Sequence, residues 1–383
     1  MDDLSMRAGI LERANALHDL ISGDAAESER LGRQTDAVKA ALLDSGLLAI
    51  LLPERVGGLG GRRLEFFEAV EAIARADGSA GWCVSVCNTV NHAAFVGLPA
   101  EGRDEVFGQG PTSLWTSLIP RVTARPEPGG FRISCPGSFG SGSSLSDWVL
   151  VAALVGAPGD GRYRAFVLPK ADVEINDGSW DVMGLRATAS IDYTIADQFV
   201  PAHRSWEYEW ASRDASGPVS AADAIRLNAI GLSAFACGIG QGALADLVAS
   251  ATKTKRTVGE GLLAEDSVVQ FGIGELDGRM RAARTHLAAL VAMMDARIAR
   301  GETTDPDQAI EIVQACQTLA RAAREAVIFA FDYAGASVIH ARAPLQRRLR
   351  DIFAGLKHAA FTPAFLSLIG KRQLGLPYAR TIL

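Results

Sequence analysis

Paired cysteines, basic runs and long apolar runs are all missing from this 383-residue chain, and each absence excludes a class of protein. The five cysteines are scattered and never spaced as Cys-x-x-Cys, so neither a disulfide framework nor a zinc site is indicated, and no metal is expected. The net charge of −6 comes without a long Lys/Arg run. Nucleic acid and anionic membrane surfaces are therefore not expected as partners.

Two further absences bear on location and on cofactor. No stretch of about 18 uninterrupted apolar residues occurs, and the acidic, helix-patterned N-terminus lacks a basic and then apolar leader. We therefore expect a cytoplasmic protein that neither spans a membrane nor is exported. The run at 231–245, "GLSAFACGIGQGALA", follows no predicted strand, so it indicates close helix packing rather than a dinucleotide-binding turn.

What the chain has is a globular composition, with 48% hydrophobic residues, and three successive textures. Apolar residues recur at helical spacing over 1–110, which predicts an N-terminal helical domain. Short alternating and β-branched runs over 111–205 predict a middle β domain. The alanine-rich patterns of 206–383 predict a C-terminal four-helix bundle. Its helices are expected near 223–254, 265–300, 306–338 and 345–370.

The last of these helices contains the first candidate for chemistry. Residues 347–365, "RRLRDIFAGLKHAAFTPAF", fit one amphipathic helix with Arg347, Asp351 and His358 along its polar side. Such a stripe is typical of a solvated surface. An imidazole also titrates close to working pH, which suits it to acid and base catalysis. The pattern by itself leaves both interpretations open.

Three motifs, in this order along the chain, resemble those of the acyl-CoA dehydrogenases. They are "GLLAILLPERVGGLGG" at 46–61, "EAIARADGSAGW" at 71–82 and "MGLRATASIDYTIADQFVP" at 183–201. The resemblance covers nearly the whole chain. It implies a mostly α fold with a central β domain, made of an N-terminal helical domain, a small β-barrel domain and a C-terminal four-helix bundle.

Within this superfamily the chain departs from the true dehydrogenases, because the glutamate base that they carry in an "EGT"-like context is absent. "RDIFAGLKH" at 350–358 and "FRISCPGSFGSGSSLSDW" at 131–148 are instead similar to the flavin-dependent monooxygenases built on the same fold. The resemblance implies the oxygenase component of a two-component system, a homotetramer that receives reduced FAD or FMN from a separate NAD(P)H flavin reductase. With O₂, a C4a-hydroperoxyflavin would then hydroxylate an aromatic or heteroatom-containing small molecule.

The same resemblance assigns roles to three catalytic residues. His358 matches the histidine near the flavin ring and would act as a base toward the substrate or as a donor to the peroxide. Ser141, on a glycine-flanked turn, would hydrogen-bond to flavin N5. His92 falls where several family members place a second active-site histidine. A turn serine and a structural histidine are the alternative interpretations.

The resemblance also assigns the residues that bind the cofactor. Trp148, with Trp180, would form a wall beside the isoalloxazine, or would be part of the aromatic core. Ala187 and Ala189 stand where relatives usually have glycine, and Cys135 and Gly137 stand where they have glycine and tryptophan. The predicted cofactor-binding residues are Phe139, Ser141, Gly142, Trp148, Arg186, Thr188, Ser190 and Arg256, the last on the flavin phosphates.

Two other functions remain open at this point. The first is an acyl-CoA dehydrogenase with a displaced base, for which Glu325 and Asp332 are the candidates and which would hold FAD tightly. The second is a non-catalytic protein of the same fold that binds a ligand or a partner. The two alanines at glycine positions favour this second alternative.

Overall fold

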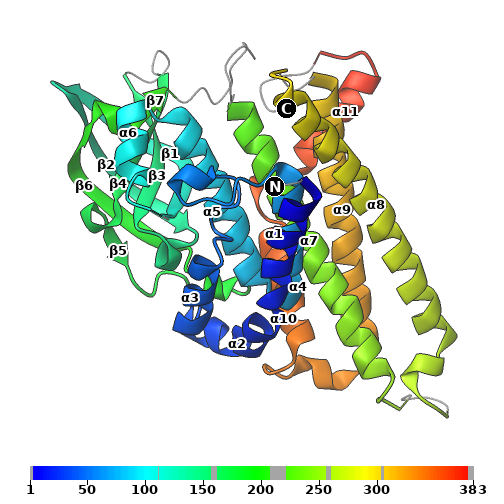
Figure 1. Ribbon diagram of the computed structural model, residues 1–383. Helices are drawn as coiled ribbons and strands as arrows, with labels where there is room; N and C mark the ends of the chain where they lie inside the picture. Colours follow the sequence, from blue (N-terminus) through cyan, green and yellow to red (C-terminus); the bar gives the residue numbers. More distant parts are fainter. Residues whose placement is uncertain are drawn as a thin grey trace.

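The protein is mostly α-helical, with one sheet at one side of the molecule and the long C-terminal helices at the other (Figure 1). The expected fold class is thereby confirmed. The structure, a computed structural model, describes residues 3–110, 112–156, 162–207, 221–255, 260–302 and 306–377.

The N-terminal helices place two buried elements between the sheet and the bundle (Figure 1). Asp77 ends one of these helices and caps the next, because its Oδ1 accepts a hydrogen bond from the Ala80 amide at 3.0 Å. The helices are α1 (Asp3–Ala16), α2 (His18–Leu31), α3 (Asp36–Asp44), α4 (Arg63–Ala76), α5 (Gly78–Gly97) and α6 (Ala100–Phe107). Since α4 and α5 are buried along most of their length, they connect the two halves of the molecule.

The middle of the chain forms a seven-stranded sheet in the order β5-β6-β2-β1-β3-β4-β7. All described pairs are antiparallel except β1 with β3, which is parallel. Among the described strands the pairing starts at β5 and ends at β7, so the expected barrel is a sheet with two open edges rather than a hydrogen-bonded ring. The strands are β1 (Leu114–Glu127), β2 (Gly130–Gly140), β3 (Trp148–Val155), β4 (Arg162–Pro169), β5 (Glu174–Asn176), β6 (Ile191–Pro201) and β7 (Ser205–Glu207).

The C-terminal helices pack against α4 and α5 through α7, which is the most apolar of them. Within the described part of the chain α7 alone is long and apolar enough to cross a membrane, but 72% of that window is buried in the fold, as in a core helix. Gly238 lets α7 approach α4 closely, as the small-residue run predicted. The helices are α7 (Ala221–Ala251), α8 (Ser267–Ala299), α9 (Pro306–Tyr333), α10 (Pro344–Gly355) and α11 (Pro363–Gln373).

The prediction of one continuous helix over 347–365 is wrong. α10 ends at Gly355, and α11 begins at Pro363, which has no amide to continue a helix and disfavours helical backbone at the residue before it. His358 lies between the two helices and caps a short 3₁₀ turn at Ala359–Phe361. The polar stripe is not solvated either, because Arg347 and Asp351 are both buried.

A glycine-to-alanine pair tests the contact between α7 and α4. A Cβ atom at Gly238 would lie 2.3 Å from the Glu71 carbonyl oxygen, whereas a Cβ at Gly23 on α2 would meet nothing within 4 Å. We expect Gly238→Ala to lower the free energy of unfolding by about 1–3 kcal/mol, because the backbones must separate. Gly23→Ala should leave it unchanged or raise it by up to ~1 kcal/mol. Urea titrations compare the two, and equal effects would contradict the close contact.

Candidate active site

The turn that follows β2 carries the predicted flavin-facing serine. Phe139 (φ 61°) and Gly142 (φ 82°) have left-handed backbone on either side of Ser141, whose amide donates to the Phe139 carbonyl at 2.9 Å. The Gly142 amide donates to the Thr188 carbonyl at 2.9 Å, which fixes the turn against a second loop. Ser141 is buried, while the Phe139 ring is exposed. It packs edge-on against the Trp180 ring, with the ring centroids 5.8 Å apart.

The second loop runs from Leu185 to Ser190 and contains the two alanines found at glycine positions. Leu185 and Ala189 both have left-handed backbone, with φ of 58° and 46°. This conformation costs a residue with a side chain about 1–2 kcal/mol. Side chains hold it in place, because Ser143 Oγ donates to the Ala189 carbonyl at 2.8 Å and Gln34 Nε2 donates to the Ala187 carbonyl at 3.0 Å. Alanine thus occupies a backbone that glycine adopts more easily.

Three hydroxyl groups of the turn and the loop form one hydrogen-bonded chain. Thr188 Oγ1 donates to the Leu185 carbonyl at 2.8 Å and lies 2.6 Å from Ser190 Oγ, which lies 2.6 Å from Ser141 Oγ. Trp82 Nε1 donates to Ser141 Oγ at 3.2 Å. Each hydroxyl has one proton, so Ser190 must donate to Thr188, and Ser141 to Ser190. Ser141 therefore has an unused lone pair and no unused proton.

His358 packs against the same tryptophan. Its ring meets the Trp82 ring edge-on, with centroids 5.9 Å apart, and Trp82 also packs edge-on against Phe235 at 5.2 Å. His358 Nδ1 accepts a hydrogen bond from the Ala360 amide at 3.1 Å, so the proton of the neutral ring is on Nε2. Burial lowers the pKa of His358 to about 4. At neutral pH the ring is thus uncharged and presents an N–H donor.

Trp82 is the residue that sequence reasoning missed. It donates a hydrogen bond to Ser141 and meets the His358 ring edge-on, so it joins the β2 turn, the 185–190 loop and the segment after α10 into one site. It is the last residue of the 71–82 motif. A tryptophan in an otherwise small-residue stretch was the available signal, but the partners that give it a role lie far away in the sequence.

One predicted residue lies away from this group, and another lies outside the described residues. His92 is half-buried on α5, and ten residues separate it from Trp82, which is about 15 Å along the helix axis. Its predicted catalytic role therefore stays a prediction. Arg256, predicted to bind the flavin phosphates, lies outside the described residues.

The two other predicted flavin-binding residues have structural contacts. The Trp148 ring is half-buried under the Arg204 guanidinium, 5.4 Å from its centroid. Arg186 Nη1 donates to the Val182 carbonyl at 2.7 Å and lies 3.2 Å from Asp181 Oδ1. These contacts place Trp148 at the junction of the sheet and the helices, and Arg186 at the outer side of the 185–190 loop.

The bases proposed for a dehydrogenase lie on the outside of the bundle. Glu325 is exposed and paired with Arg279, with Oε2 and Nη1 2.6 Å apart. Asp332 is exposed near the end of α9. A carboxylate that removes a proton from carbon needs a position beside the substrate in a water-poor site. Neither residue has that position, so the displaced-base alternative is not supported.

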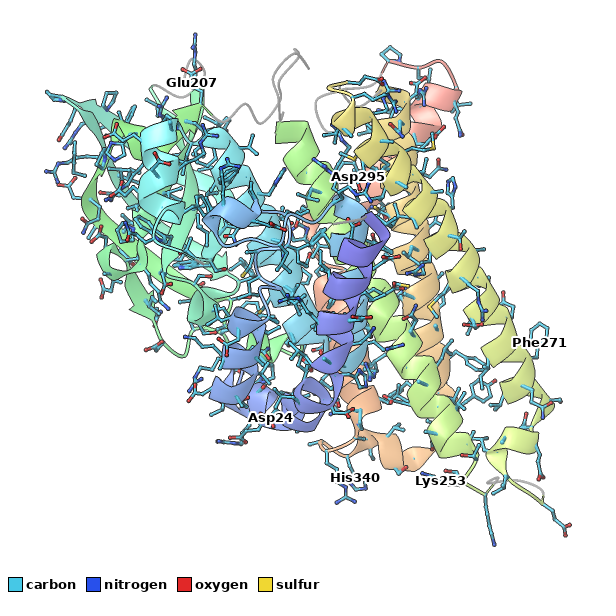
Figure 2. The ribbon with its side chains drawn as sticks, viewed as in Figure 1. Asp24, Glu207, Lys253, Phe271, Asp295 and His340 are labelled. Carbon is cyan, nitrogen blue, oxygen red and sulfur yellow. The ribbon has the colours of Figure 1, made fainter. Side chains whose placement is uncertain are left out.

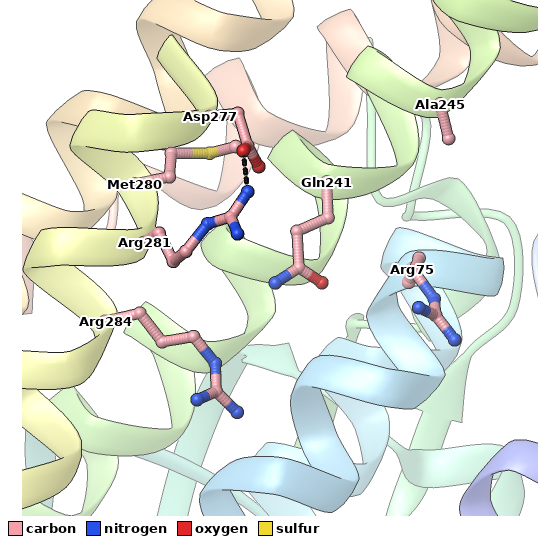
Figure 3. Close-up of a pocket in the computed structure, with 7 residues that line it drawn as sticks. All are labelled: Arg75, Gln241, Ala245, Asp277, Met280, Arg281 and Arg284. Atoms are coloured by element: carbon pink, nitrogen blue, oxygen red, sulfur yellow. Dashed lines mark hydrogen bonds and ion pairs between the residues drawn. The ribbon is translucent and has the colours of Figure 1, made fainter. Parts of the chain in front are cut away.

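A cavity of about 330 Å³ lies apart from this site, between α4, α7 and α8 (Figure 3). Arg281 pairs with Asp277, and Arg284 donates to Glu71 with Nη2 and Oε2 2.6 Å apart. The guanidinium groups that line this cavity are thus mostly paired with carboxylates. The residues lining it are Arg75, Gln241, Ala245, Asp277, Met280, Arg281 and Arg284.

Reduced flavin fits the groups of the candidate site. Its N5 carries a proton, and Ser141 offers a buried hydroxyl with a free acceptor position. The exposed ring of Phe139 beside Trp180 provides aromatic surface next to that hydroxyl. Ser141, Ser190 and Thr188 would face the ring system, and His358 would present its Nε2 proton beyond Trp82.

The lowered pKa of the half-buried His358 ring leads to a prediction about stability and pH. Because the pKa of His358 is about 4 in the folded protein and 6.5 as a free group, the unfolded chain binds a proton first as pH falls. The stability that His358 contributes is therefore present above pH 6.5 and is lost toward pH 4. Relative to His358→Asn, wild type should lose up to about 3 kcal/mol of unfolding free energy across this range. Urea titrations at several pH values measure the difference, with His340→Asn, at an exposed position between α9 and α10, as control. Parallel curves for wild type and His358→Asn would contradict the burial.

Comparison with known proteins shows the family to which the chain belongs. Residues 15–97 match the family model "Acyl-CoA dehydrogenase, N-terminal domain", and residues 230–363 match "Acyl-CoA dehydrogenase, C-terminal domain". The chain is 30% identical over 370 residues to the flavin-dependent monooxygenase oxygenase subunit HsaA of Mycobacterium tuberculosis, covering 93% of this chain and 92% of that protein. The crystal structure of HsaA superposes with a TM-score of 0.88, at 27% identity over 98% of this chain and 100% of that one.

Two further relatives name the cofactor. The oxygenase component of the FADH₂-dependent resorcinol hydroxylase of Rhizobium sp. is 28% identical, over 96% of this chain and 94% of that protein. XiaF from Streptomyces sp., solved with FADH₂ and glycerol, has a TM-score of 0.89 at 25% identity, over 98% of this chain and 97% of that one. The chain belongs to the flavin-dependent monooxygenases that are built on the acyl-CoA dehydrogenase fold and use reduced flavin.

Proposed function

We propose that the protein hydroxylates a phenol or a related aromatic small molecule, with O₂ as cosubstrate and with reduced FAD or FMN from a separate NAD(P)H flavin reductase. The observation that carries the proposal is the hydroxyl chain that ends at Ser141, together with His358, which packs against the same Trp82 that donates to Ser141. The names of the relatives support a separate reductase, since one is an oxygenase subunit and another an oxygenase component. The resorcinol hydroxylase supports an aromatic substrate.

Ser141 is expected to hold the reduced cofactor in one orientation. Bound reduced flavin supplies the electrons and activates O₂ in this class of enzyme. The direction of the hydroxyl chain makes Ser141 an acceptor, so it suits the N5 proton of the reduced ring. Burial of Ser141, Thr188 and Ser190 keeps this contact away from water, which would otherwise compete for the same hydrogen bonds.

His358 is expected to act as a hydrogen-bond donor. Of the two roles that the family resemblance allows, donation fits the tautomer, since Nδ1 is occupied by the Ala360 amide and Nε2 carries the proton. A base at Nε2 would first have to lose that proton. The lowered pKa also keeps the ring neutral, so His358 can orient a phenolic oxygen without a charge in the aromatic surroundings of Trp82 and Phe235.

Two variants separate the roles of the serine and the histidine. Ser141→Ala should bind reduced flavin more weakly and divert turnover from product to H₂O₂, because the N5 contact is lost. His358→Asn should lower product formation by roughly tenfold, because the shorter amide side chain does not reach the position of the Nε2 donor, while leaving the flavin dissociation constant nearly unchanged. Product analysis, H₂O₂ release and anaerobic flavin titration measure these effects.

Lys357→Ala, next to His358 but exposed, is the matched control and should resemble wild type. A stopped-flow reaction of the reduced protein with O₂ completes the test. An absorbing intermediate that is neither reduced nor oxidised flavin is expected in wild type. Direct return to oxidised flavin, with no product from any phenol offered, would contradict the proposed function.

We also propose a cytoplasmic homotetramer, as the family resemblance implies. All five cysteines are buried and unpaired, which suits a reducing compartment. The outer face of α8 carries exposed apolar side chains, among them Phe271, which is 73% exposed and points away from the helix (Figure 2). Met293 and Val268 are exposed on the same helix, and a Cβ at Gly274 or Gly278 would meet nothing within 4 Å. A monomer rarely leaves such a face in water.

Phe271→Glu tests this assembly. A charge in the centre of an apolar contact is costly to bury, so the variant should shift the protein from tetramers toward smaller species at micromolar concentration. Sedimentation velocity gives the masses. Tyr163→Glu, an exposed aromatic residue on β4, should leave the assembly unchanged. Equal masses for wild type and Phe271→Glu would contradict an interface through α8.

A further inference from the structure

A buried cluster of charges lies behind the candidate site. Arg347 and Asp351 of α10 meet Asp77, which caps α5, and all three side chains are less than one-tenth exposed. Arg347 Nε lies 3.4 Å from Asp77 Oδ2. Asp351 Oδ1 accepts a hydrogen bond from the Leu185 amide at 2.6 Å. Two buried carboxyl groups therefore lie near one guanidinium, and each accepts its own backbone amide, Asp77 from Ala80 and Asp351 from Leu185.

Each member of the cluster holds an element that contributes to the site. Asp77 fixes the start of α5, which carries Trp82. Asp351 fixes Leu185, the first residue of the 185–190 loop. α10 itself leads directly to His358. The cluster thus joins the three elements that the site requires.

The Leu185 peptide group connects Asp351 to the hydroxyl chain. Its N–H donates to Asp351, and its C=O accepts hydrogen bonds from Thr188 Oγ1 at 2.8 Å and Trp180 Nε1 at 2.9 Å. Leu185 also has φ of 58°, a backbone that is unfavourable without such partners. If the N–H lost its acceptor, the carbonyl that ends the hydroxyl chain would lose its fixed position as well.

Glycines bring the three elements into direct contact at this point. A Cβ at Gly78 would lie 2.9 Å from Asp351 Oδ2, and a Cβ at Gly184 would lie 2.2 Å from the Arg350 carbonyl oxygen. The second contact is with backbone, which a side-chain rotation does not relieve. α10 is therefore seated against both α5 and the loop, and Asp351 is placed by packing as well as by charge.

We propose that Asp351 is a positioning residue for the monooxygenase reaction, which fixes the 185–190 loop and through it the hydroxyl group of Ser141. The role rests on the proposed function, because it gives Ser141 the contact with reduced flavin. Asp351 itself touches Leu185 rather than the candidate cofactor position, so it acts through the loop.

The charges around Asp351 make this support sensitive to pH. Burial raises the pKa of Asp351 to about 7, and repulsion by Asp77 adds to the rise, while the Leu185 amide and Arg347 oppose it. Burial raises the pKa of Asp77 also. The remaining charged groups on the adjoining elements are Glu29 of α2, which pairs with Arg350, and Arg348 of α10, which pairs with Asp246 of α7.

The sign of the effect follows from the raised pKa. The folded state keeps a proton that the unfolded chain has lost, so the stability contributed by Asp351 is complete below pH 3.8 and disappears as pH rises through about 7. The hydrogen bond from Leu185 strengthens over the same range, because a carboxylate is a better acceptor than a carboxylic acid. Asp351→Asn keeps an acceptor oxygen at this position, but its side chain does not titrate.

Hydrogen exchange of the flavin-free protein tests the support directly. We expect Asp351→Ala to speed exchange in the 184–190 segment by roughly tenfold, since one charge-assisted hydrogen bond is lost. Asp351→Asn should retain most of the protection but lose its change between pH 5.5 and 8. If Asp351→Ala does not fold, Asp351→Asn still tests the inference through this pH response.

Asp295→Ala is the matched control. Asp295 is also a buried carboxylate that accepts backbone amides, from Arg63 and Leu64, and pairs with Arg63, but it holds the start of α4, whereas Asp77 follows the last residue of that helix. It should lower overall stability without a selective change at 184–190. A merely structural role for Asp351 predicts the same pattern for Asp351→Ala, and that result would overturn the inference.

Turnover with reduced flavin completes the experiment. Asp351→Ala should release a larger share of its oxygen as H₂O₂ and lower kcat more than it raises KM for the aromatic substrate, with Asp351→Asn intermediate. Unchanged coupling despite faster loop exchange would overturn the positioning role. If wild type itself forms no hydroxylated product while the loop responds as expected, the proposed function fails and the support of the loop by Asp351 stands.

Discussion

The hydrogen bond from the Leu185 amide to Asp351 joins two parts of the chain that are 166 residues apart, and the geometry of the site depends on it. The loop that it holds has two residues with left-handed backbone and no glycine at either one. Such a loop does not keep its shape by local preference, so its shape must come from contacts with the rest of the molecule. Asp351, Gln34 and Ser143 supply those contacts from three different elements.

The site combines polar groups with burial in a way that limits what each group can do. Thr188 donates to the Leu185 carbonyl, so Ser190 must donate to Thr188 and Ser141 must donate to Ser190. Ser141 can therefore only accept a further hydrogen bond. His358 is uncharged because burial opposes its protonation. A neutral donor on one side and a hydroxyl acceptor on the other suit a reaction that must keep water away from reduced flavin.

The sequence was sufficient for the fold class and insufficient for the arrangement of the site. Helical and alternating patterns predicted the three regions, and the resemblance predicted Ser141, Thr188, Ser190 and His358, which the structure places around Trp82. The continuous helix over 347–365 was wrong, because the pattern of apolar residues continues through Gly355 while the backbone does not. Burial of Arg347 and Asp351 was not predictable either, since it depends on Asp77 and Leu185, which lie far away in the sequence.

The two buried titratable groups of the site affect stability in opposite directions. As pH rises from about 4 to 6.5, the unfolded chain gives up the extra proton of His358, which favours the folded state. Over the same interval the folded protein retains a proton on Asp351 that the unfolded chain lacks, which disfavours the folded state as pH rises. The two groups change the free energy of unfolding with pH in opposite directions, so their effects largely cancel. A flat stability profile of the whole protein would therefore hide both groups, and single substitutions at each position are needed to separate them.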